Sequence, residues 1–392
     1  MAVNAQPLKS PAPAAPRQDP HGLESATLRK IQAENAKHFV SLQEIVAAAH
    51  RNLSRSVWDM LSGGSDSEMT LRRNRYALDS LALRQRVMVN VTNIDTTTSL
   101  LGQKMPIPVF IAPIGNYLQL ADPEGALPVA RAAAAKGMPA FISTAAKPGI
   151  DLIAQSVPEP MIFQLYIRSD RAWVADILDR AKALGYRALC VTVDRAYYSR
   201  RERDMINRLA VREGGINTHQ SSLTWDDVVW MKSHMGLPLI LKGIATAEDA
   251  KLAVEHGADA VYVSNHGGRQ LDQAQGSIEV LPEVVQAVDG RAEVLMDGGI
   301  CRGTDIVKAV ALGARAVGVG KLYGWALAAA GQAGVERMIE LLEAEIRSTL
   351  GLMGVTSLAQ LNPSWVRPGQ PVLPQGPGIT SPFPVFEEQN RG

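Results

Sequence analysis

Cysteine, net charge and long apolar runs are all scarce in this sequence of 392 residues. Its two cysteines, Cys190 and Cys301, predict neither a disulfide framework nor a CxxC metal site. Because 40 basic residues face 39 acidic ones, the net charge is only +1 and nucleic acid is not expected as a partner. The sequence has no run of about 18 apolar residues, so no transmembrane segment is expected. These absences favour a cytoplasmic protein whose partner is a small molecule.

Both ends of the chain are rich in proline. Residues 1–23 lack the continuous apolar stretch of a signal peptide, and we expect a disordered leader there. The tail, residues 362–392, contains RPGQPVLPQGPGITSPFP, which predicts an irregular segment that is either loose or wrapped around a neighbouring subunit. The intervening residues 24–361 are enough for one large domain.

One pattern recurs three times in this domain: the end of a helix, a glycine, and an apolar β run. It occurs at residues 181–193, 253–264 and 309–320, with the glycine where each helix is expected to stop. Similar β runs occur at 108–113, 140–144, 161–166, 237–243 and 293–299. Together these segments predict eight strands.

Helical patterns lie between the strands, and several begin at an Asp, Ser or Thr that can cap a helix. They cover residues 123–136, 170–184, 225–235, 246–256, 279–288 and 303–312. Apolar strands that alternate with helices favour an α/β fold, a (β/α)8 TIM barrel with strands at about 108–320. The strand count alone also allows a doubly wound sheet. Residues 24–90 would form a helical N-terminal extension, and 333–350 an amphipathic closing helix.

Polar residues and glycines follow nearly every predicted strand. In a barrel the carboxyl ends of the strands meet at one rim, where active sites form. Any single polar turn has an ordinary structural explanation, but their convergence on one rim indicates a site. The residues at these ends are Pro113, Ile114, Gly115, Ser143, Thr144, Gln164, Tyr166, Thr192, Asp194, Lys242, Ser264, His266, Arg269, Asp297, Gly298, Gly299, Gly320 and Lys321.

The loops after the last two strands, DGGICRGTD and GVGKLYG, suggest a phosphate site. Glycines let backbone N–H groups approach a phosphate at a helix N-terminus, and Lys321 or Arg302 would supply positive charge. Alternatively, the glycines only shape the turns. Cys301 lies in the same loop, but no local motif supports a nucleophile there.

His266 is the best candidate for a general base, because the ordinary pKa of histidine lies near neutrality. Asp194 could orient its imidazole, while a purely structural histidine is the alternative. Lys242 ends an apolar strand, where it could form a Schiff base or hold an anion. Arg201, from the charge-dense run at 195–208, and Arg269 would together bind a carboxylate beside the histidine.

Five motifs give the chain a resemblance to the FMN-dependent α-hydroxy-acid oxidase and dehydrogenase family: SNHGGRQLD, TVDRAYYSRRERDMINR, LILKGIATAEDA, FQLY and DGGICRGTDIVKAVALGA. The family includes glycolate oxidase, lactate monooxygenase and mandelate dehydrogenase, and the likeness extends from about Ser41 to Leu361. It implies that a small 2-hydroxy acid is oxidised to a 2-oxo acid with FMN as hydride acceptor. A carbanion route would use the same residues.

The resemblance also implies a role for each site residue. His266 would be the base, with Asp194 hydrogen-bonded to it, while Arg201 and Arg269 would hold the substrate carboxylate and Tyr166 its hydroxyl. The remaining roles concern FMN. Lys242, Pro113, Ile114, Gly115, Ser143, Gln164, Thr192 and Ser264 would contact the flavin ring, and Asp297, Gly298, Gly299, Gly320 and Lys321 the ribityl chain and phosphate.

The chain departs from the family pattern at several places. Met60 stands where the family has a tyrosine that helps bind the carboxylate, so one contact is expected to be lost. Cys301 and Lys321 stand where arginine is usual, which predicts weaker binding of FMN. The segment between Arg208 and Trp225 is short, which predicts an open entrance. Gly115 stands where many oxidases have alanine. In the family a glycine there is associated with monooxygenases and dehydrogenases, and of these we favour a dehydrogenase.

Several expectations about partners follow from the same comparison. No CxxCH haem motif is present, so the electron acceptor would be a separate molecule. The family implies a homo-oligomer, a tetramer. One alternative function is an FMN-dependent isomerase of a phosphorylated substrate, and another is a catalytically weak paralogue that only binds a ligand. The intact set of His266, Asp194, Lys242, Arg201 and Arg269 argues against the last of these.

Overall fold

The computed structural model describes residues 25–208, 214–370 and 382–383. The predicted leader, residues 1–23, lies outside the described residues, as do 371–381 and 384–392 of the predicted tail. Among the described helices, none is both long enough and apolar enough to cross a membrane.

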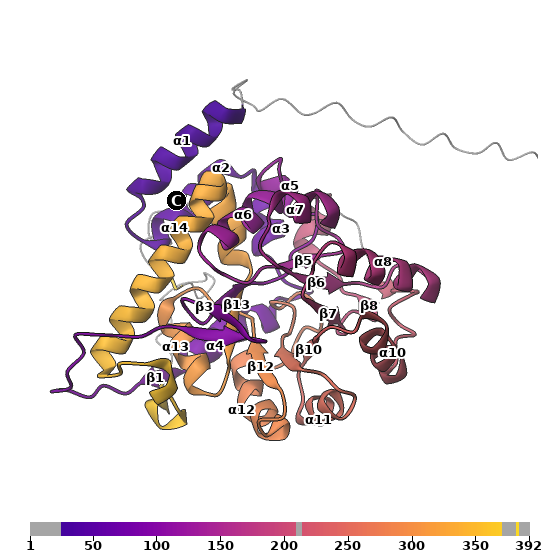
Figure 1. Ribbon diagram of the computed structural model, residues 1–392. Coiled ribbons are helices and arrows are strands. Elements are labelled where there is room, and N and C mark those ends of the chain that lie inside the picture. Colours follow the sequence, from indigo (N-terminus) through magenta and orange to yellow (C-terminus); the bar gives the residue numbers. More distant parts are fainter. Residues whose placement is uncertain (1–24, 209–213, 371–381, 384–392) are drawn as a thin grey trace, which may run out of the picture.

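Eight parallel strands form the centre of the fold (Figure 1). Their order around the sheet is β4, β13, β12, β11, β10, β7, β6, β5, and a parallel bridge between Ile111 and Ala140 joins the two edges. The predicted TIM barrel is therefore confirmed, and the doubly wound alternative is wrong. The strands are β4 (Val109–Ile111), β5 (Phe141–Ser143), β6 (Ile162–Leu165), β7 (Ala188–Thr192), β10 (Leu239–Ile244), β11 (Ala260–Val263), β12 (Glu293–Met296) and β13 (Ala316–Val319).

The strands read as continuous apolar runs because both of their faces are buried. Alternate residues point into the barrel, where Phe110 packs against Phe141 at 4.8 Å and against Tyr262 at 5.3 Å between ring centroids. The other set points outward to the helices and belongs to the larger of the two apolar clusters. Aromatic rings thus fill the barrel interior, as side chains do in barrels of this type.

The helices around the barrel agree with the predicted patterns to within a few residues. Asp170 and Thr246 cap two of them with their side chains, as the sequence indicated, and the backbone N–H of Thr224 donates to Asp227 at the start of a third. Two short helices, α5 (Leu118–Ala121) and α7 (Ile150–Ser156), are additional to the prediction. The others are α6 (Leu127–Ala135), α8 (Arg171–Ala183), α10 (Trp225–Met235), α11 (Ala247–Glu255), α12 (Ser277–Val288) and α13 (Gly303–Ala311).

The N-terminal extension is helical, as predicted. It consists of α1 (Ser25–His38), α2 (Leu42–Asn52), α3 (Arg55–Ser62) and α4 (Met69–Asp79). In Figure 1, α1 and α2 lie along α14 (Lys321–Met353), and the contacts between these helices agree. The predicted closing helix, 333–350, is the second half of α14, which is interrupted at Ala330 and Gly331. Gly331 has a positive φ and approaches Gln32 of α1 so closely that a Cβ would lie 2.4 Å from its side-chain oxygen.

Three small sheets surround the barrel. A hairpin of β2 (Thr98–Leu100) and β3 (Gln103–Met105) packs Leu100 and Met105 against the interior rings. Near the site, β8 (Tyr197–Tyr198) pairs with β9 (Gly215–Ile216), and α9 (Glu202–Ile206) follows β8.

Part of the predicted irregular tail is ordered. After two 3-10 turns, η1 (Leu358–Gln360) and η2 (Pro363–Trp365), the strand β14 (Val366–Pro368) pairs with β1 (Leu81–Leu83). Further along, Phe383 is buried with its ring 6.4 Å from that of Trp325. The tail thus contacts its own chain at two places.

Candidate active site

A cavity of about 720 Å³ lies at the carboxyl ends of the barrel strands. Its volume suits a ligand larger than a simple metabolite. Thirteen of the residues with a predicted role line it: Pro113, Ile114, Gly115, Tyr166, Arg201, Lys242, His266, Arg269, Asp297, Gly298, Gly299, Gly320 and Lys321. The remaining five do not line the cavity, but hydrogen bonds described below connect them to it or to residues near it. They are Ser143, Gln164, Thr192, Asp194 and Ser264.

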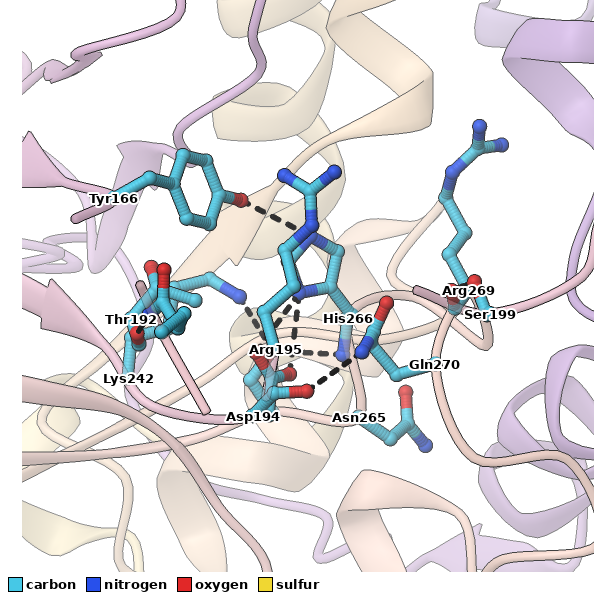
Figure 2. A network of polar contacts seen from close by, with 12 residues as sticks. Tyr166, Thr192, Asp194, Arg195, Ser199, Lys242, Asn265, His266, Arg269 and Gln270 are labelled. Atoms are coloured by element: carbon cyan, nitrogen blue, oxygen red, sulfur yellow. Dashed lines mark hydrogen bonds and ion pairs between the residues drawn. The ribbon is translucent and has the colours of Figure 1, made fainter. Parts of the chain in front are cut away.

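His266 lies between a carboxylate and a phenol. Its Nδ1 is 3.1 Å from both carboxylate oxygens of Asp194, and its Nε2 is 3.1 Å from the hydroxyl of Tyr166 (Figure 2). An imidazole that donates from Nδ1 to a carboxylate has an acceptor lone pair at Nε2. Asp194 is placed by the end of β7 and His266 by the loop after β11, so the ends of two strands of the barrel bring the pair together.

The electrostatics favour the form of His266 that can accept a proton. Burial lowers its pKa below the ordinary value, against the opposing effect of the Asp194 carboxylate. Burial disfavours the Asp194 carboxylate too, yet the charge of His266 and the hydrogen bond from it hold the pKa of Asp194 below its ordinary value. At neutral pH the site therefore holds a neutral imidazole beside an ionised carboxylate, the arrangement of an oriented general base.

Lys242 is held by a network at the ends of three neighbouring strands. Its Nζ donates to Ser264 Oγ at 2.8 Å and lies 3.6 Å from an Asp297 carboxylate oxygen. Asp297 also accepts from Ser264 Oγ at 2.6 Å and from Tyr262 OH at 2.8 Å. Although burial opposes it, the charges of Asp297 and Asp194 raise the pKa of Lys242 to about 12. A lysine that stays protonated is a fixed cation, which favours the anion-holding role over a Schiff base.

A second polar group lies at the ends of β5, β6 and β7. Gln164 donates from its amide nitrogen to Thr192 Oγ1 at 2.8 Å, and Ser143 Oγ accepts from the backbone of Ala145 at 3.1 Å. Gln164 Oε1 is buried and has no hydrogen-bond partner among the described residues. Such an acceptor is suited to an N–H group of a bound heterocycle.

The glycines of the expected phosphate loops differ in what surrounds them. Gly298 and Gly299 both have positive φ, and a Cβ on the first would lie 2.6 Å from Ser277 Oγ and on the second 3.0 Å from Asn74 Cβ. A Cβ on Gly320, by contrast, would meet no atom within 4 Å. The first two glycines therefore serve packing against α4 and α12, while Gly320 opens onto the cavity.

Lys321 is the cation of this end of the cavity. Its Nζ donates to the carbonyl of Gly267 at 2.7 Å, and burial together with the charge of Arg269 lowers its pKa to about 7. Arg302, the other candidate, is paired with Glu345 of α14 at 2.8 Å. Cys301 is buried, and burial raises its pKa to about 12, which disfavours a thiolate nucleophile. Lys321 is thus the better placed of the two cations for a phosphate.

The two predicted carboxylate-binding arginines meet at a tyrosine. Arg201 donates to the hydroxyl of Tyr117 at 2.9 Å, and the Tyr117 ring centroid lies 5.9 Å from the Arg201 guanidinium and 5.5 Å from that of Arg269. Arg269 donates to the carbonyls of Met60 at 2.6 Å and Gly63 at 3.0 Å. Arg201 Nε and Arg269 NH2 are buried with no hydrogen-bond partner in the described part of the chain.

Two cavity residues escaped the sequence-based prediction. Tyr117 lies just before α5, outside every motif, and only its meeting with the arginines shows its importance. Arg195 follows Asp194 directly, but in the charge-dense run it resembled a solvent-facing residue. Its guanidinium lies 4.7 Å above the ring of Tyr166. Its position one residue after a predicted strand end was the available sequence signal.

The donor set fits a flavin nucleotide. The unpartnered Gln164 oxygen and the fixed Lys242 cation suit a polar heterocycle, and Lys321 beside the open Gly320 suits a phosphate. Fold and site together define a barrel enzyme with an oriented histidine base, a phosphorylated cofactor and an anionic substrate.

Comparisons with known proteins agree with this class. The family model described as FMN-dependent dehydrogenase matches residues 49–368, and the chain belongs to this family, whose cofactor is FMN. An L-lactate oxidase from Nostoc sp. (strain PCC 7120 / SAG 25.82 / UTEX 2576) is 41% identical over 83% of this chain and 98% of the relative. A glycolate oxidase from Spinacia oleracea is 38% identical over 84% and 95%. A solved mandelate oxidase structure has a TM-score of 0.78 and 40% identity over 86% of this chain and 100% of that chain.

Proposed function

We propose that this protein oxidises a 2-hydroxy acid to the 2-oxo acid, with oxygen as the electron acceptor. The observation that carries the proposal is His266, held between Asp194 and Tyr166 beside the Arg201 and Arg269 pair in one cavity. A base beside two cations matches a substrate with a hydroxyl next to a carboxylate. The names of the relatives, which are lactate, glycolate and mandelate oxidases, support this substrate class.

The substrate carboxylate binds to Arg201 and Arg269, each of which has one buried nitrogen without a hydrogen-bond partner in the described structure. Planar guanidinium groups match a carboxylate with paired hydrogen bonds. Met60 lines the cavity and accepts from Arg269 with its backbone carbonyl but has no hydroxyl, whereas Tyr117 places a hydroxyl beside Arg201. Tyr117 therefore supplies the phenol that the resemblance led us to expect at position 60.

Proton removal falls to His266. Nε2 accepts a proton from the substrate, and the Asp194 carboxylate stabilises the imidazolium that results. Tyr166 donates a hydrogen bond at the same nitrogen in the absence of substrate, and it turns to the substrate oxygen once substrate binds. When bound, FMN would supply the two-electron acceptor, and Lys242 would contribute a fixed positive charge to the site that holds it.

Oxygen is the proposed acceptor although Gly115 favoured a dehydrogenase. A Cβ at position 115 would lie 3.0 Å from the Cβ of Ala145, so the glycine accommodates a packing contact with its neighbour across the cavity. This contact explains why position 115 is a glycine without reference to the electron acceptor. The balanced reaction converts a 2-hydroxy acid and O2 into a 2-oxo acid and H2O2.

The test is to purify the protein with FMN and mix it with a panel of 2-hydroxy acids in air and without oxygen. The proposal expects flavin bleaching near 450 nm, a usual flavin band, without oxygen, and equal amounts of 2-oxo acid and H2O2 in air. Turnover only with an added dye would replace the oxidase with the dehydrogenase. Binding of a phosphorylated substrate without net electron transfer would support the isomerase.

We also propose that the protein is cytoplasmic and forms a homotetramer, as the sequence led us to expect. Light scattering on the FMN-loaded protein tests the assembly, and a mass other than that of four chains would contradict it.

A further inference from the structure

The cavity carries far more positive than negative charge. Among the described residues that line it, eight are lysines or arginines and one, Asp297, is acidic. Five of the eight already have a role. Arg75 is paired with Asp305 and Lys242 with Asp297. Lys321 is assigned to the phosphate, and Arg201 and Arg269 are assigned to the substrate carboxylate. The other three are Lys147, Arg168 and Arg195.

Of these three, Arg195 is the one held inside the site. Lys147 and Arg168 are exposed, whereas Arg195 is partly buried and its guanidinium lies 4.7 Å from the ring centroid of Tyr166 and 5.4 Å from that of Tyr198. Figure 2 shows Arg195 rising from the end of β7 past Asp194, with its guanidinium directed to the Tyr166 side. The side chain thus lies beside the phenol that contacts His266.

Arg195 differs from a neighbouring arginine in its partners. Arg203 is paired with Asp59 at 3.3 Å and Glu68 at 2.6 Å. Arg195 Nε is buried without a hydrogen-bond partner, and no described carboxylate lies within 4.0 Å of its guanidinium. A buried donor without a partner is unusual in a folded protein and is costly. A guanidinium that lies over two rings can still direct N–H groups to a ligand.

We propose that Arg195 binds a second carboxylate, carried on the side chain of the 2-hydroxy acid. This inference rests on the proposed function, in which Arg201 and Arg269 bind the first carboxylate beside Tyr117. Arg195 contacts a different ring, Tyr166, so the two cationic groups reach the substrate from separate parts of the cavity. The exposed Arg168 extends the positive charge to the entrance and attracts a dianion.

The size of the site agrees with a substrate longer than the smallest 2-hydroxy acids. Gly115 and Ala145 meet at the cavity wall, and neither has a side chain larger than a methyl group. Because these two residues pack against each other, the room for a side chain of several atoms comes from the cavity as a whole, about 720 Å³.

The experiment compares two substrates of equal chain length in the FMN-loaded protein, 2-hydroxyglutarate and 2-hydroxyvalerate. The proposal expects kcat/KM to be at least about tenfold higher for the dicarboxylate, the usual effect of one charged hydrogen bond. Arg195→Met should remove this preference, lowering kcat/KM for 2-hydroxyglutarate at least about tenfold more than kcat/KM for 2-hydroxyvalerate. Arg200→Met, an exposed arginine outside the cavity, is the matched control and should keep the preference.

A binding measurement separates this inference from the chemistry. Titration of 2-oxoglutarate and 2-oxovalerate into oxidised protein, followed by the flavin absorbance, should show tighter binding of the dicarboxylate and loss of the difference in Arg195→Met. If Arg195→Met does not retain FMN, Arg195→Lys replaces it and should give an intermediate preference.

Three outcomes would overturn the inference. Equal losses on both substrates in Arg195→Met would make Arg195 a positioning residue for Tyr166. A preference for 2-hydroxyvalerate, or for an analogue with a terminal phosphate, would contradict a second carboxylate. A separate result, in which the protein oxidises none of the 2-hydroxy acids, would refute the proposed function. The 2-oxo acid titration would then still show whether Arg195 selects dicarboxylates.

Discussion

The inner and outer parts of the active site differ in how their polar groups are paired. The inner site consists of Asp194, Lys242, Ser264, His266 and Asp297, and each of these side chains has a partner. The outer site consists of Tyr117, Arg195, Arg201 and Arg269, and all three of its arginines have a buried nitrogen without a hydrogen-bond partner in the described structure.

This contrast separates two tasks. Groups that satisfy each other keep one geometry without a ligand, which suits proton transfer and a fixed charge beside a cofactor. Cations with an unsatisfied N–H donor can gain a hydrogen bond from a ligand, which suits recognition of an anionic substrate. The inner residues lie within three residues of the ends of barrel strands, where the barrel holds them, and so does Arg195, whereas Tyr117, Arg201 and Arg269 lie farther along the loops.

The largest expected effect comes from breaking the inner site at His266. His266→Gln should lower kcat by about 10³-fold, within the usual contribution of a general base, because glutamine cannot take up the proton. FMN should remain bound, since the flavin contacts are elsewhere. Stopped-flow reduction of the flavin measures the change.

The control for this prediction is His234→Gln, because His234 lies on α10 and pairs with Asp179 outside the cavity. It should leave the rate unchanged. Reduction of His266→Gln at the wild-type rate would show that another group removes the proton.

The next effect comes from the outer site at Arg201. Arg201→Met should lower kcat/KM by about 10- to 100-fold, as expected for lost hydrogen bonds between charged groups. The loss should appear mainly in KM, because the inner site is unchanged. Steady-state kinetics with the best substrate of the panel checks this, and a fall in kcat alone would argue against a carboxylate contact.

The cofactor end of the cavity gives a pH-dependent prediction. Burial lowers the pKa of Lys321 to about 7, and a bound phosphate would raise it, so FMN binding takes up a proton above that pH. Affinity for FMN should therefore fall as pH rises from 7.5 to 9, by up to about tenfold per pH unit, because the phosphate itself is already ionised there.

Lys321→Arg is the matched variant for this prediction, since arginine stays protonated throughout. It should bind FMN with little dependence on pH over the same range. Fluorescence titration of FMN into the FMN-free protein measures both, and a pH-independent affinity in the unaltered protein would exclude Lys321 from the phosphate contact.

The smallest effect should follow the loss of the Tyr117 hydroxyl. Tyr117→Phe should raise KM about five- to tenfold, the effect of one hydrogen bond of modest strength, with kcat nearly unchanged. Tyr197→Phe, which alters an exposed tyrosine, should have no effect. Adding Met60→Tyr to Tyr117→Phe should restore much of the affinity, and failure of both changes to move KM would remove Tyr117 from substrate binding.

Much of the fold was predictable because its elements are regular. The eight apolar runs, each followed by a polar group or glycine, correspond to the eight barrel strands. The break in α14 at Gly331 was not predicted, because it depends on the approach of Gln32 from a helix far away in the sequence.

The site was predictable where a residue lies at a strand end, as for His266, Asp194 and Lys242. The site was less predictable where a side chain could pair with more than one group. Arg302 looked equal to Lys321 as a phosphate cation, but α14 places Glu345 beside it. Asp297 was expected at the ribityl chain, whereas its carboxylate contacts Tyr262, Ser264 and Lys242.

The sequence by itself determined the barrel and the residues at its rim, because hydrophobic periodicity and the chemistry of strand ends are local properties. Tertiary structure alone decided which rim residues are paired and which are free to bind a ligand. Tyr117 and Arg201 are 84 positions apart, and nothing in either segment encodes their contact. Partner choice depends on distances between segments, which only the folded chain establishes.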